Sequence, residues 1–449
     1  MLSESRYSRI LLEIERPEAL LEREDVRTFI ETLDQPGKHA GRYRSWSKGR
    51  FHDPKPQGIP MEHLEALVRL HRERVSVSTS LLAHARKPMR LNLSVSTRMG
   101  VAEVVELLAL RGSPEAEAPL EEELETWQLR GLLEEAFASS AIEGTVTTRK
   151  IASELARDKR QPRGRSEQML LNNWVALRRL GEWQEQPLTP SLLCEIQSVI
   201  TKDPGLKPEE VGAFRTVDDV AVINGEGGDV VHQPPPAEQL AERMERLCLF
   251  AREDQGFPSL VRAILIHHQI AFDHPFVDGN GRTARLVFML EATRDPALNW
   301  LSLVPFSRAI ANRKDSYYRA FVDTAEENWD TTHFVRNQLR SLAIECERLA
   351  GFLTDFSRRR ALYTQKLALE DDLNSRQIEL IRSGLKPNSP PFTQVEHAHH
   401  HQVTPMTANR DLARLTALRL LSKRRNPKDK RQFLYWPTKL LLSLGEDES

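Results

Sequence analysis

The sequence has little cysteine and no long apolar run. Three cysteines occur among 449 residues, at Cys194, Cys248 and Cys346. An odd number of scattered cysteines offers neither a disulfide framework nor a metal cluster, and it suits a reducing cytoplasm. No apolar stretch approaches the about 18 residues that a transmembrane helix needs. The N-terminus also lacks the basic-then-apolar pattern of a signal peptide. We therefore expect a cytoplasmic protein that does not enter a membrane.

The chain also lacks an excess of charge of either sign. Its formal net charge is −1 and its pI is about 7.0. Long-range attraction to nucleic acid or to an anionic membrane surface is therefore absent at the level of the whole chain. The length is enough for roughly two or three domains.

The most informative segment is His274–Arg285, which reads HPFVDGNGRTAR. The mostly apolar run 259–272 before it predicts a buried helix. Pro275 cannot continue that helix and pushes His274 out of helical geometry. A second helix is predicted over 282–293, so the polar residues of this segment lie at a corner between two helices.

These residue types together suit phosphate chemistry. Gly279 and Gly281 allow the backbone to approach a ligand closely. The amides of such a turn and of the helix that follows it attract an anion. Arg282 and Arg285 lie three positions apart and can reach one face of that helix, where their planar guanidinium groups suit phosphate oxygens.

The segment also contains a base and a hard metal ligand. His274 can accept a proton from a hydroxyl near neutral pH. Asp278 is an oxygen ligand of the kind that Mg²⁺ uses together with phosphate oxygens. The alternative is a glycine-rich helix start with solvated arginines, but the conjunction of all these positions favours a nucleotide site.

The segment resembles the core motif of the Fic family, His-x-Phe-x-(Asp/Glu)-Gly-Asn-Gly-Arg-x-x-Arg, at every fixed position. The resemblance implies a helical fold that transfers AMP from ATP to a protein hydroxyl, with His274 as the base and Phe276 as a packing residue. It implies these ligands for ATP and Mg²⁺: Asp278 for the metal, Gly279, Asn280 and Gly281 as the phosphate cradle, Arg282 for the β-phosphate and Arg285 for the γ-phosphate.

Two β-prone runs upstream of the motif predict a hairpin. They are 220–223 and 230–232, and they flank the glycine-rich turn 224–228. An ordinary surface hairpin would give the same pattern. In the Fic family a hairpin at this place is the flap, which aligns an extended target segment by strand addition.

A second motif lies at the end of the helix-prone segment 120–144. Ser139 and Glu143 share a helix face, and Gly144 is a plausible terminator. Alone, the pattern also fits a solvated glutamate. Beside the core motif it resembles the family's inhibitory helix, here about 131–144, which implies that Glu143 pairs with Arg285 and blocks the productive pose of the γ-phosphate. Some relatives use this glutamate to activate water for AMP removal.

The pattern changes again in the C-terminal part. Helices are predicted over 376–383, 392–400 and 404–418, followed by two strands at 420–422 and 433–436 around the basic turn 423–431. This order resembles a winged helix-turn-helix domain, which implies DNA contact through the third helix and the turn. The alternative is a module that only packs or dimerises. We predict that the nearby histidines 397, 399, 400 and 401 form a solvated turn and not a metal site.

The expected fold is therefore mainly α: a Fic-type helical bundle with a short hairpin flap, plus a C-terminal winged helix-turn-helix module. The predicted regions are an N-terminal helical accessory region (1–118), the catalytic domain (119–355), a connector helix (356–371) and the winged helix-turn-helix domain (372–440). Within the first region, residues 35–60 are rich in Gly, Pro and basic residues and are expected to be loop or extended.

The predicted function is a protein adenylyltransferase that uses ATP and Mg²⁺ and is inhibited by Glu143. The expected partners are a target protein with a Ser, Thr or Tyr hydroxyl and DNA at 372–440, with a homodimer as a family-level expectation. Two alternatives stand beside this function. One is a Fic enzyme that removes AMP or transfers another phosphate-containing group. The other is a DNA-binding regulator with a chemically silent Fic-like body.

Overall fold

The computed structural model is mainly helical, as the sequence predicts. It describes residues 4–109, 121–158, 160–202, 206–218, 222–223, 230–253, 256–370, 373–384, 390–427, 429 and 432–438. These residues form two compact units. The first contains Met1–Ala109 and Arg130–Glu347, and the second contains Leu110–Leu129 and Arg348–Ser449. Among the described helices, none combines the length and the apolar character that crossing a membrane requires.

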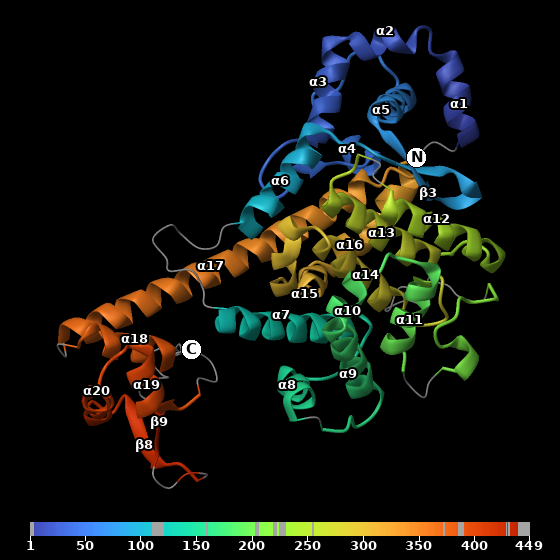
Figure 1. The fold of residues 1–449 in the computed structure, drawn as a ribbon. Coiled ribbons are helices and arrows are strands. Elements are labelled where there is room, and N and C mark those ends of the chain that lie inside the picture. Colours follow the sequence, from blue (N-terminus) through green and yellow to red (C-terminus); the bar gives the residue numbers. More distant parts are fainter. Residues whose placement is uncertain are drawn as a thin grey trace. The chain divides into compact units, whose positions relative to one another are not determined.

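The centre of the first unit is a pair of helices that pack against each other, α13 (Ser259–Asp273) and α14 (Asn280–Thr293) (Figure 1). Both form where apolar runs predict them, and almost all of their residues are buried. Neighbouring helices enclose this pair on several sides, which explains why the pair is apolar around most of its circumference. The helices in contact with α13 or α14 are α9 (Arg165–Arg178), α10 (Leu180–Gln184), α11 (Pro190–Ile200), α12 (Leu240–Arg252) and η4 (Pro296–Leu303).

Two long helices belong partly to each unit. The first, α7, spans Glu121–Ile142, and the second, α17, spans Thr332–Glu370. The stretch predicted as a separate connector helix is the C-terminal part of α17, because no helix-breaking residue interrupts the chain there. The remaining helices of this region are α8 (Arg149–Asp158), α15 (Phe306–Ala311) and α16 (Lys314–Glu326).

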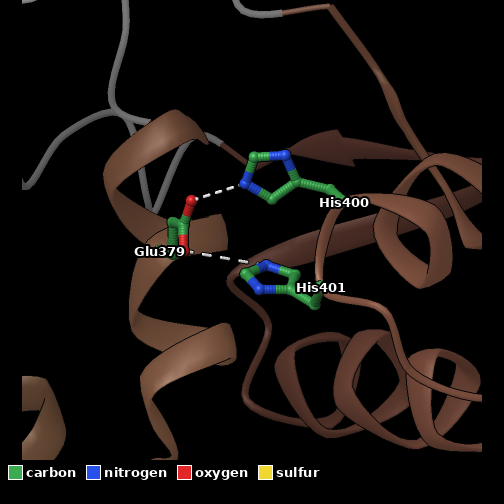
Figure 2. A group of neighbouring side chains, drawn as sticks. All are labelled: Glu379, His400 and His401. Atoms are coloured by element: carbon green, nitrogen blue, oxygen red, sulfur yellow. Dashed lines mark hydrogen bonds and ion pairs between the residues drawn. The ribbon is translucent and has the colours of Figure 1, made fainter.

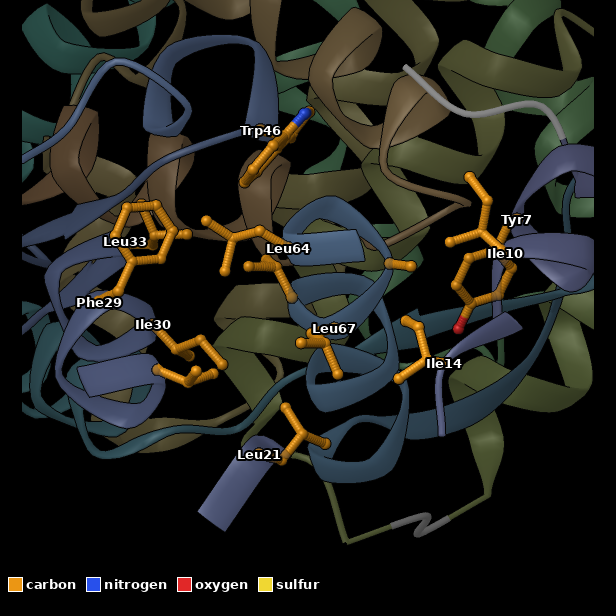
Figure 3. Close-up of a cluster of buried hydrophobic side chains, with 13 residues drawn as sticks. Tyr7, Ile10, Ile14, Leu21, Phe29, Ile30, Leu33, Trp46, Leu64 and Leu67 are labelled. Carbon is orange, nitrogen blue, oxygen red and sulfur yellow. The ribbon is translucent and has the colours of Figure 1, made fainter. Parts of the chain in front are cut away.

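The N-terminal region packs its own apolar core (Figure 3). Its central helix is α5 (Met61–Val75), whose Leu64 and Leu67 are completely buried. Tyr7 and Phe29 pack on this core from other helices. The helices around α5 are α1 (Glu4–Glu13), α2 (Pro17–Glu22), α3 (Glu24–Leu33) and α4 (Trp46–Gly49), with α6 (Val95–Ala109) following later in the chain.

Short strand pairs complete the first unit. The predicted flap forms an antiparallel pair in the described residues, β5 (Val222–Ile223) with β6 (Val230–His232). Its turn, 224–228, lies outside the described residues. The other pairs are β1 (Asp34–Gln35) with β2 (Arg42–Tyr43), and β3 (Val77–Leu82) with β4 (Pro88–Leu91).

The C-terminal residues of the second unit form three helices and a three-stranded sheet in the order β7-β9-β8. Phe392 was expected to start the second helix but lies in β7, because Thr393 caps the helix instead, by accepting a hydrogen bond from the amide of Glu396. The elements are α18 (Ser375–Gly384), β7 (Phe392–Thr393), α19 (Gln394–His400), α20 (Pro405–Ala417), β8 (Leu421–Arg425) and β9 (Phe433–Pro437).

The histidine cluster of α19 is not simply a solvated turn. His397 is buried, and its Nε2 lies 3.2 Å from Asp411. His400 forms a 2.8 Å hydrogen bond with Glu379 of α18, and His401 lies 3.8 Å from the same carboxylate (Figure 2). The carboxylate that the local sequence lacks is supplied by another helix, so the cluster ties the end of α19 to α18.

Candidate active site

His274 is placed by the end of α13. Its backbone is left-handed (φ 48°), and its amide still donates to the carbonyl of Ile270 at 3.0 Å. Nδ1 lies 3.4 Å from the carbonyl of Ala271. When Nδ1 carries the proton and donates it to this carbonyl, Nε2 is the nitrogen that can accept a proton. Burial lowers the pKa of His274, although the Ala271 hydrogen bond and the Glu143 charge act in the opposite direction. The ring is therefore neutral, and able to act as a base, at neutral pH.

The loop after His274 is held by Asn280. Its Oδ1 accepts from the amide of Phe276 at 2.8 Å, and its Nδ2 donates to the carbonyl of Phe276 at 2.8 Å. The Asn280 side chain is buried and fully engaged in these bonds. Asn280 can therefore contribute to a phosphate cradle through its backbone amide, whereas its side chain shapes the loop.

The N-terminus of α14 has the backbone geometry that the sequence predicts for an anion-binding turn. Gly279 caps the helix with a φ of 85°, and the first intrahelical bond is the one from Thr283 to the carbonyl of Gly279. The amides before Thr283 are therefore available to an anion, with the helix dipole adding attraction. A Cβ atom on Gly279 would lie 2.6 Å from Cγ2 of Thr201, so only glycine fits there.

Arg285 is buried against the end of α7. Its Nη2 donates to Oε1 of Glu143 at 2.8 Å and to the carbonyl of Ser139 at 3.0 Å, and its Nε donates to Oγ of Ser139 at 3.0 Å. The contact that the sequence predicts between Glu143 and Arg285 is thus present. Gly144 follows with a φ of 84°, the left-handed conformation expected of a helix terminator.

The Glu143 carboxylate also lies over the start of α14. A Cβ atom on Gly281 would overlap Oε1 of Glu143 and lie 3.0 Å from Nη1 of Arg285. Gly281 therefore makes room for a negatively charged group next to the helix N-terminus. In this structure Glu143 supplies that group.

Asp278 and Arg282 lie beside this centre but point to other partners. Asp278 is 38% exposed, and its carboxylate is 3.3 Å from Arg282 and 3.3 Å from Arg165. Arg282 is buried and donates to the carbonyl of Ile200 at 3.1 Å. The two motif arginines thus contact different elements in this structure, Arg285 on α7 and Arg282 at the end of α11.

A cavity of about 230 Å³ opens beside His274. Glu143, Gly281 and Arg285 line its polar side. Most of the other lining residues are aromatic or apolar, and they include Phe272, Tyr317, Tyr318, Phe321 and Trp329. Tyr317, the first of two adjacent tyrosines, is buried.

His268 gives this cavity a polar group in an apolar wall. It is buried, and neither ring nitrogen has a hydrogen-bond partner among the described residues. Its ring stacks on Phe321 with centroids 5.0 Å apart. A flat heterocycle would fit such a wall.

Arg215 is a positioning residue that sequence reasoning missed. Its Nε donates to the carbonyl of His274 at 2.9 Å, and its guanidinium also contacts the carbonyls of Val217 and Pro235, on either side of the flap. Its own amide donates to the carbonyl of Pro275 at 2.8 Å. One buried side chain thus joins the His274 corner to both ends of the flap segment.

Gln197 has a similar bridging role. Its Nε2 donates to the carbonyl of Asp278 at 3.1 Å, and its Oε1 accepts from the amide of Gly212 at 2.6 Å. Its distance in sequence from both partners gives no signal of this role. The sequence shows only a polar residue among the apolar residues of the segment 190–200.

Comparison with known proteins identifies the domain around these residues. Residues 187–292 match the sequence model of the Fic/DOC family. A curated relative named protein adenylyltransferase Fic, from Nematostella vectensis, is 29% identical over 163 residues, which cover 34% of this chain and 35% of the relative. The chain thus matches about a third of that relative's length.

Solved structures share the fold over a longer stretch. A Fic family protein from Desulfovibrio desulfuricans superposes with a TM-score of 0.52 at 20% identity and covers 77% of this chain and 97% of its own. A fragment of Fic-1 from C. elegans gives a TM-score of 0.50 at 17% identity, covering 78% and 92%. At these identities the likeness concerns the fold alone. The match to the Fic/DOC family model is confined to residues 187–292, and the superpositions extend the similarity of fold beyond them.

Proposed function

We propose that the chain is a protein adenylyltransferase that transfers AMP from ATP to a hydroxyl group of a target protein, and that Glu143 restrains it. One observation carries the proposal: His274, Gly281, Arg285 and Glu143 line one cavity at the N-terminus of α14. A neutral base, an anion-binding helix end and a buried cation thus surround a single space, which is the set of groups that nucleotidyl transfer needs.

The residues present fit ATP. The amides at the start of α14 and the guanidinium of Arg285 suit the phosphate chain, and the space above Gly281 already accommodates a carboxylate. The aromatic wall of the cavity suits the adenine ring.

Mg²⁺ fits the Asp278 carboxylate. This carboxylate is partly exposed, and among the described residues its oxygens contact Arg165, Arg282 and the amide of Gly279. Asp278 would hold the ion together with phosphate oxygens and water. When bound, Mg²⁺ neutralises part of the phosphate charge and orients the chain.

The protein groups then divide the reaction between them. His274 takes the proton of the target hydroxyl through Nε2. The hydroxyl oxygen bonds to the α-phosphorus, and the bond from that phosphorus to the bridging oxygen breaks, so that pyrophosphate leaves. Arg285, Arg282 and the amides at the start of α14 hold the leaving phosphates. The β5–β6 hairpin offers a strand edge on which an extended target segment can align.

Glu143 restrains this reaction by occupying the phosphate position. Its carboxylate neutralises Arg285 and lies over Gly281, where a phosphate of ATP would bind. A charge-assisted hydrogen bond of this kind contributes roughly 1.5–3 kcal/mol. Every 1.4 kcal/mol corresponds to about tenfold in an equilibrium constant, so its loss should raise activity by about 10- to 100-fold.

The test is transfer of label from [α-³²P]ATP to protein in a lysate of the host cell. Wild type should label weakly, Glu143→Gly strongly, and Glu143→Gly with His274→Ala not at all. Glu326→Gln is the matched control, because Glu326 lines the same cavity but pairs with Arg319 at 2.9 Å. It should label like wild type.

Other outcomes point to the alternatives. Label from the γ-phosphate but not from the α-phosphate would mean transfer of a different group. No labelling by Glu143→Gly, not even of itself, would sink the proposal. If wild type instead strips AMP from a labelled target and Glu143→Gln does not, Glu143 serves as the base for water in AMP removal.

A second function, DNA binding, is favoured by the C-terminal part of the chain. Asn409, Arg410 and Arg414 are exposed on α20, and Lys423, Arg424 and Arg425 are exposed on β8. Polar and basic side chains on a third helix and on the adjoining hairpin fit the winged helix-turn-helix interpretation. Binding through such contacts weakens steeply as the salt concentration rises. Lysine and arginine side chains displace counterions from the DNA phosphates, and this release is less favourable at high salt.

A fluorescence anisotropy titration of duplex DNA with the full chain tests this function. Lys423→Gln with Arg424→Gln should weaken binding about tenfold or more and flatten its salt dependence. Arg27→Gln with Arg98→Gln removes the same charge from exposed positions of the first unit and should change neither. Negligible, salt-insensitive binding by wild type would leave the module with a packing role only.

A further inference from the structure

A second cavity in the first unit, of about 490 Å³, is lined mainly by cations. We call it the basic pocket. Its walls come from the segment around β2 and α4, from α16 and from α17. The residues of α16 that line it, such as Ser316, Arg319 and Asp323, differ from those that line the cavity beside His274, such as Tyr318 and Phe321. One helix therefore separates the two cavities.

Seven cationic side chains line the basic pocket, against two carboxylates. The cations are Arg42, Arg44, Lys48, Arg313, Arg319, Arg336 and Arg340, and the carboxylates are Asp315 and Asp323. The three from the N-terminal region belong to the basic, loop-like segment 35–60 of the sequence. Folding brings that segment against two helices that are far away in the chain.

Some of these cations are neutralised within the protein. Asp323 pairs with Arg319 at 2.8 Å and with Lys48 at 3.5 Å. Arg336 pairs with Asp34. No ion pair between described residues involves Arg42, Arg313 or Arg340. The pocket therefore has an excess of positive charge, which a bound anion would neutralise.

Two polar atoms in the lining have no protein partner in the described part of the chain, Nε of Arg313 and Nε2 of His333. His333 is only 6% exposed. An unpaired buried polar group costs roughly 1–3 kcal/mol. The pocket thus offers hydrogen-bonding groups that no described residue satisfies.

The charges in the pocket also act on one another. Burial, and then the charge of Arg340, lower the pKa of Arg313. Burial, followed by surrounding cations such as Arg72 and Lys48, lowers the pKa of His333, which is therefore neutral at pH 7. Like charges held together at a desolvated place are a common property of ligand sites and not of solvated surfaces.

The arrangement on α17 is regular. His333, Arg336, Asn337 and Arg340 are at positions i, i+3, i+4 and i+7, so they share one helix face. Arg336 is fixed by a 2.9 Å bond from Nε to the carbonyl of Ala40, and Tyr43 packs on His333 with ring centroids 4.6 Å apart. The helix face is thus rigid, as a binding wall requires.

We propose that the basic pocket binds a small anion that bears several phosphate-type charges, at a site separate from the cavity beside His274. Guanidinium groups bind phosphate oxygens by paired, planar hydrogen bonds, and several of them can satisfy one oligophosphate chain. The volume lies in the range of small-molecule sites, about 300–1,000 Å³. This proposal does not depend on AMP transfer by the chain.

The test is isothermal titration of the full chain with inorganic tripolyphosphate, in buffer with a chelator so that no metal contributes. Wild type should bind one equivalent, at the basic pocket, because the Glu143 carboxylate already occupies the phosphate position beside Arg285. Arg313→Gln with Arg340→Gln should bind at least tenfold more weakly. Arg285→Ala should bind like wild type, and so should Arg27→Gln with Arg98→Gln, which removes the same charge from exposed positions.

Folding of the key variant is checked separately. Because Arg313 and Arg340 form no ion pair among the described residues, their replacement should leave the thermal midpoint unchanged or raise it. Arg42→Gln, at an exposed side chain, provides a second variant and should weaken binding as well. The proposal is overturned if wild type does not bind, if Arg285→Ala alone abolishes binding, or if both double variants lose it equally.

Discussion

Oε1 of Glu143 and Nη2 of Arg285 lie 2.8 Å apart, and they join the end of α7 to the first turns of α14. The pair is asymmetric: the side chain of Arg285 is 2% exposed and that of Glu143 is 34% exposed. Arg285 is also fixed by Ser139, so the arginine is the stationary partner and the glutamate is the one that solvent can reach. Release of the pair therefore amounts to movement of Glu143.

Ser139→Ala tests whether the fixed partner matters. The change removes the 3.0 Å acceptor of Arg285 Nε but leaves the backbone carbonyl of Ser139 in place. The donor of this bond is the charged guanidinium and the acceptor is a neutral hydroxyl, so we take about 1.5 kcal/mol, the lower value for bonds to charged groups, as its upper limit here because the carbonyl of Ser139 still holds Arg285. We expect AMP transfer to rise by about two- to tenfold, less than in Glu143→Gly. Initial rates of labelling measure this, and a rate above that of Glu143→Gly would contradict the model of a fixed arginine.

Arg215→Gln tests the positioning of His274. In the Glu143→Gly background we expect kcat to fall by about 100-fold. Without the bond from Arg215 the His274 ring can shift, and a shift of a catalytic group by about 1 Å lowers the rate by about this factor. ATP affinity should change little, since Arg215 does not line the cavity beside His274. Arg215 also lowers the pKa of His274. Removing this charge should raise the pKa of His274, so that the ring becomes protonated, and activity is lost, at a higher pH than in the parent. Simple loss of folded protein would not shift this pH.

Local sequence was enough to predict the residues of the motif and the two helices that present them. The apolar runs before and after His274–Arg285 fix α13 and α14, and Pro275 fixes the corner between them. The Glu143–Arg285 contact was predicted only through resemblance to a family, because nothing local relates residues 142 positions apart.

The partners that orient the motif could not be predicted in the same way. Arg215 acts through carbonyl groups, and any residue type has a carbonyl, so its partners leave no pattern in the sequence. Asn280 was expected as part of the phosphate cradle, a role open to its backbone amide, but the sequence did not indicate that its side chain closes the loop on Phe276. The basic pocket arises because residues 42–48 fold against α16 and α17, a contact between distant segments.

His268→Phe tests how burial of histidine affects acid stability. Burial lowers the pKa of His268 from 6.5 to about 3. Between these values the unfolded chain binds a proton that the folded chain excludes, so the free energy of unfolding falls as pH drops. The change from pH 7 to pH 5 is about 2 kcal/mol for one such group.

In His268→Phe this part of the pH dependence should disappear. The phenyl ring that replaces the imidazole should be tolerated at pH 7, because the nitrogens of His268 have no partner among the described residues that the substitution would remove. Urea unfolding at the two pH values measures the difference. The exposed His399→Phe is the control and should retain the wild-type dependence. An unchanged dependence in His268→Phe would mean that His268 already titrates normally in the folded chain.

Asp411→Asn tests what holds the C-terminal helices together. The buried Asp411 of α20 accepts hydrogen bonds from Asn374 at 2.9 Å and from Arg376 at 2.7 Å, and it lies 3.2 Å from Nε2 of His397. Burial would raise the pKa of Asp411, but these bonds outweigh it and lower the pKa. The carboxylate is therefore charged and stabilising above the ordinary Asp pKa of about 3.9, and this contribution is lost as pH falls through its lowered value.

The side-chain amide that Asp411→Asn introduces would carry no charge. Its NH₂ group would face the donor groups of Asn374 and Arg376. We expect a loss of about 2–4 kcal/mol in local stability. Hydrogen exchange followed by mass spectrometry, on peptides covering α18–α20, should show protection reduced by about 30-fold or more, since every 1.4 kcal/mol is about tenfold. Arg410→Gln, at the exposed neighbouring position, should leave protection unchanged. Equal protection in Asp411→Asn and wild type would mean that the apolar core of this module, and not Asp411, holds its three helices together.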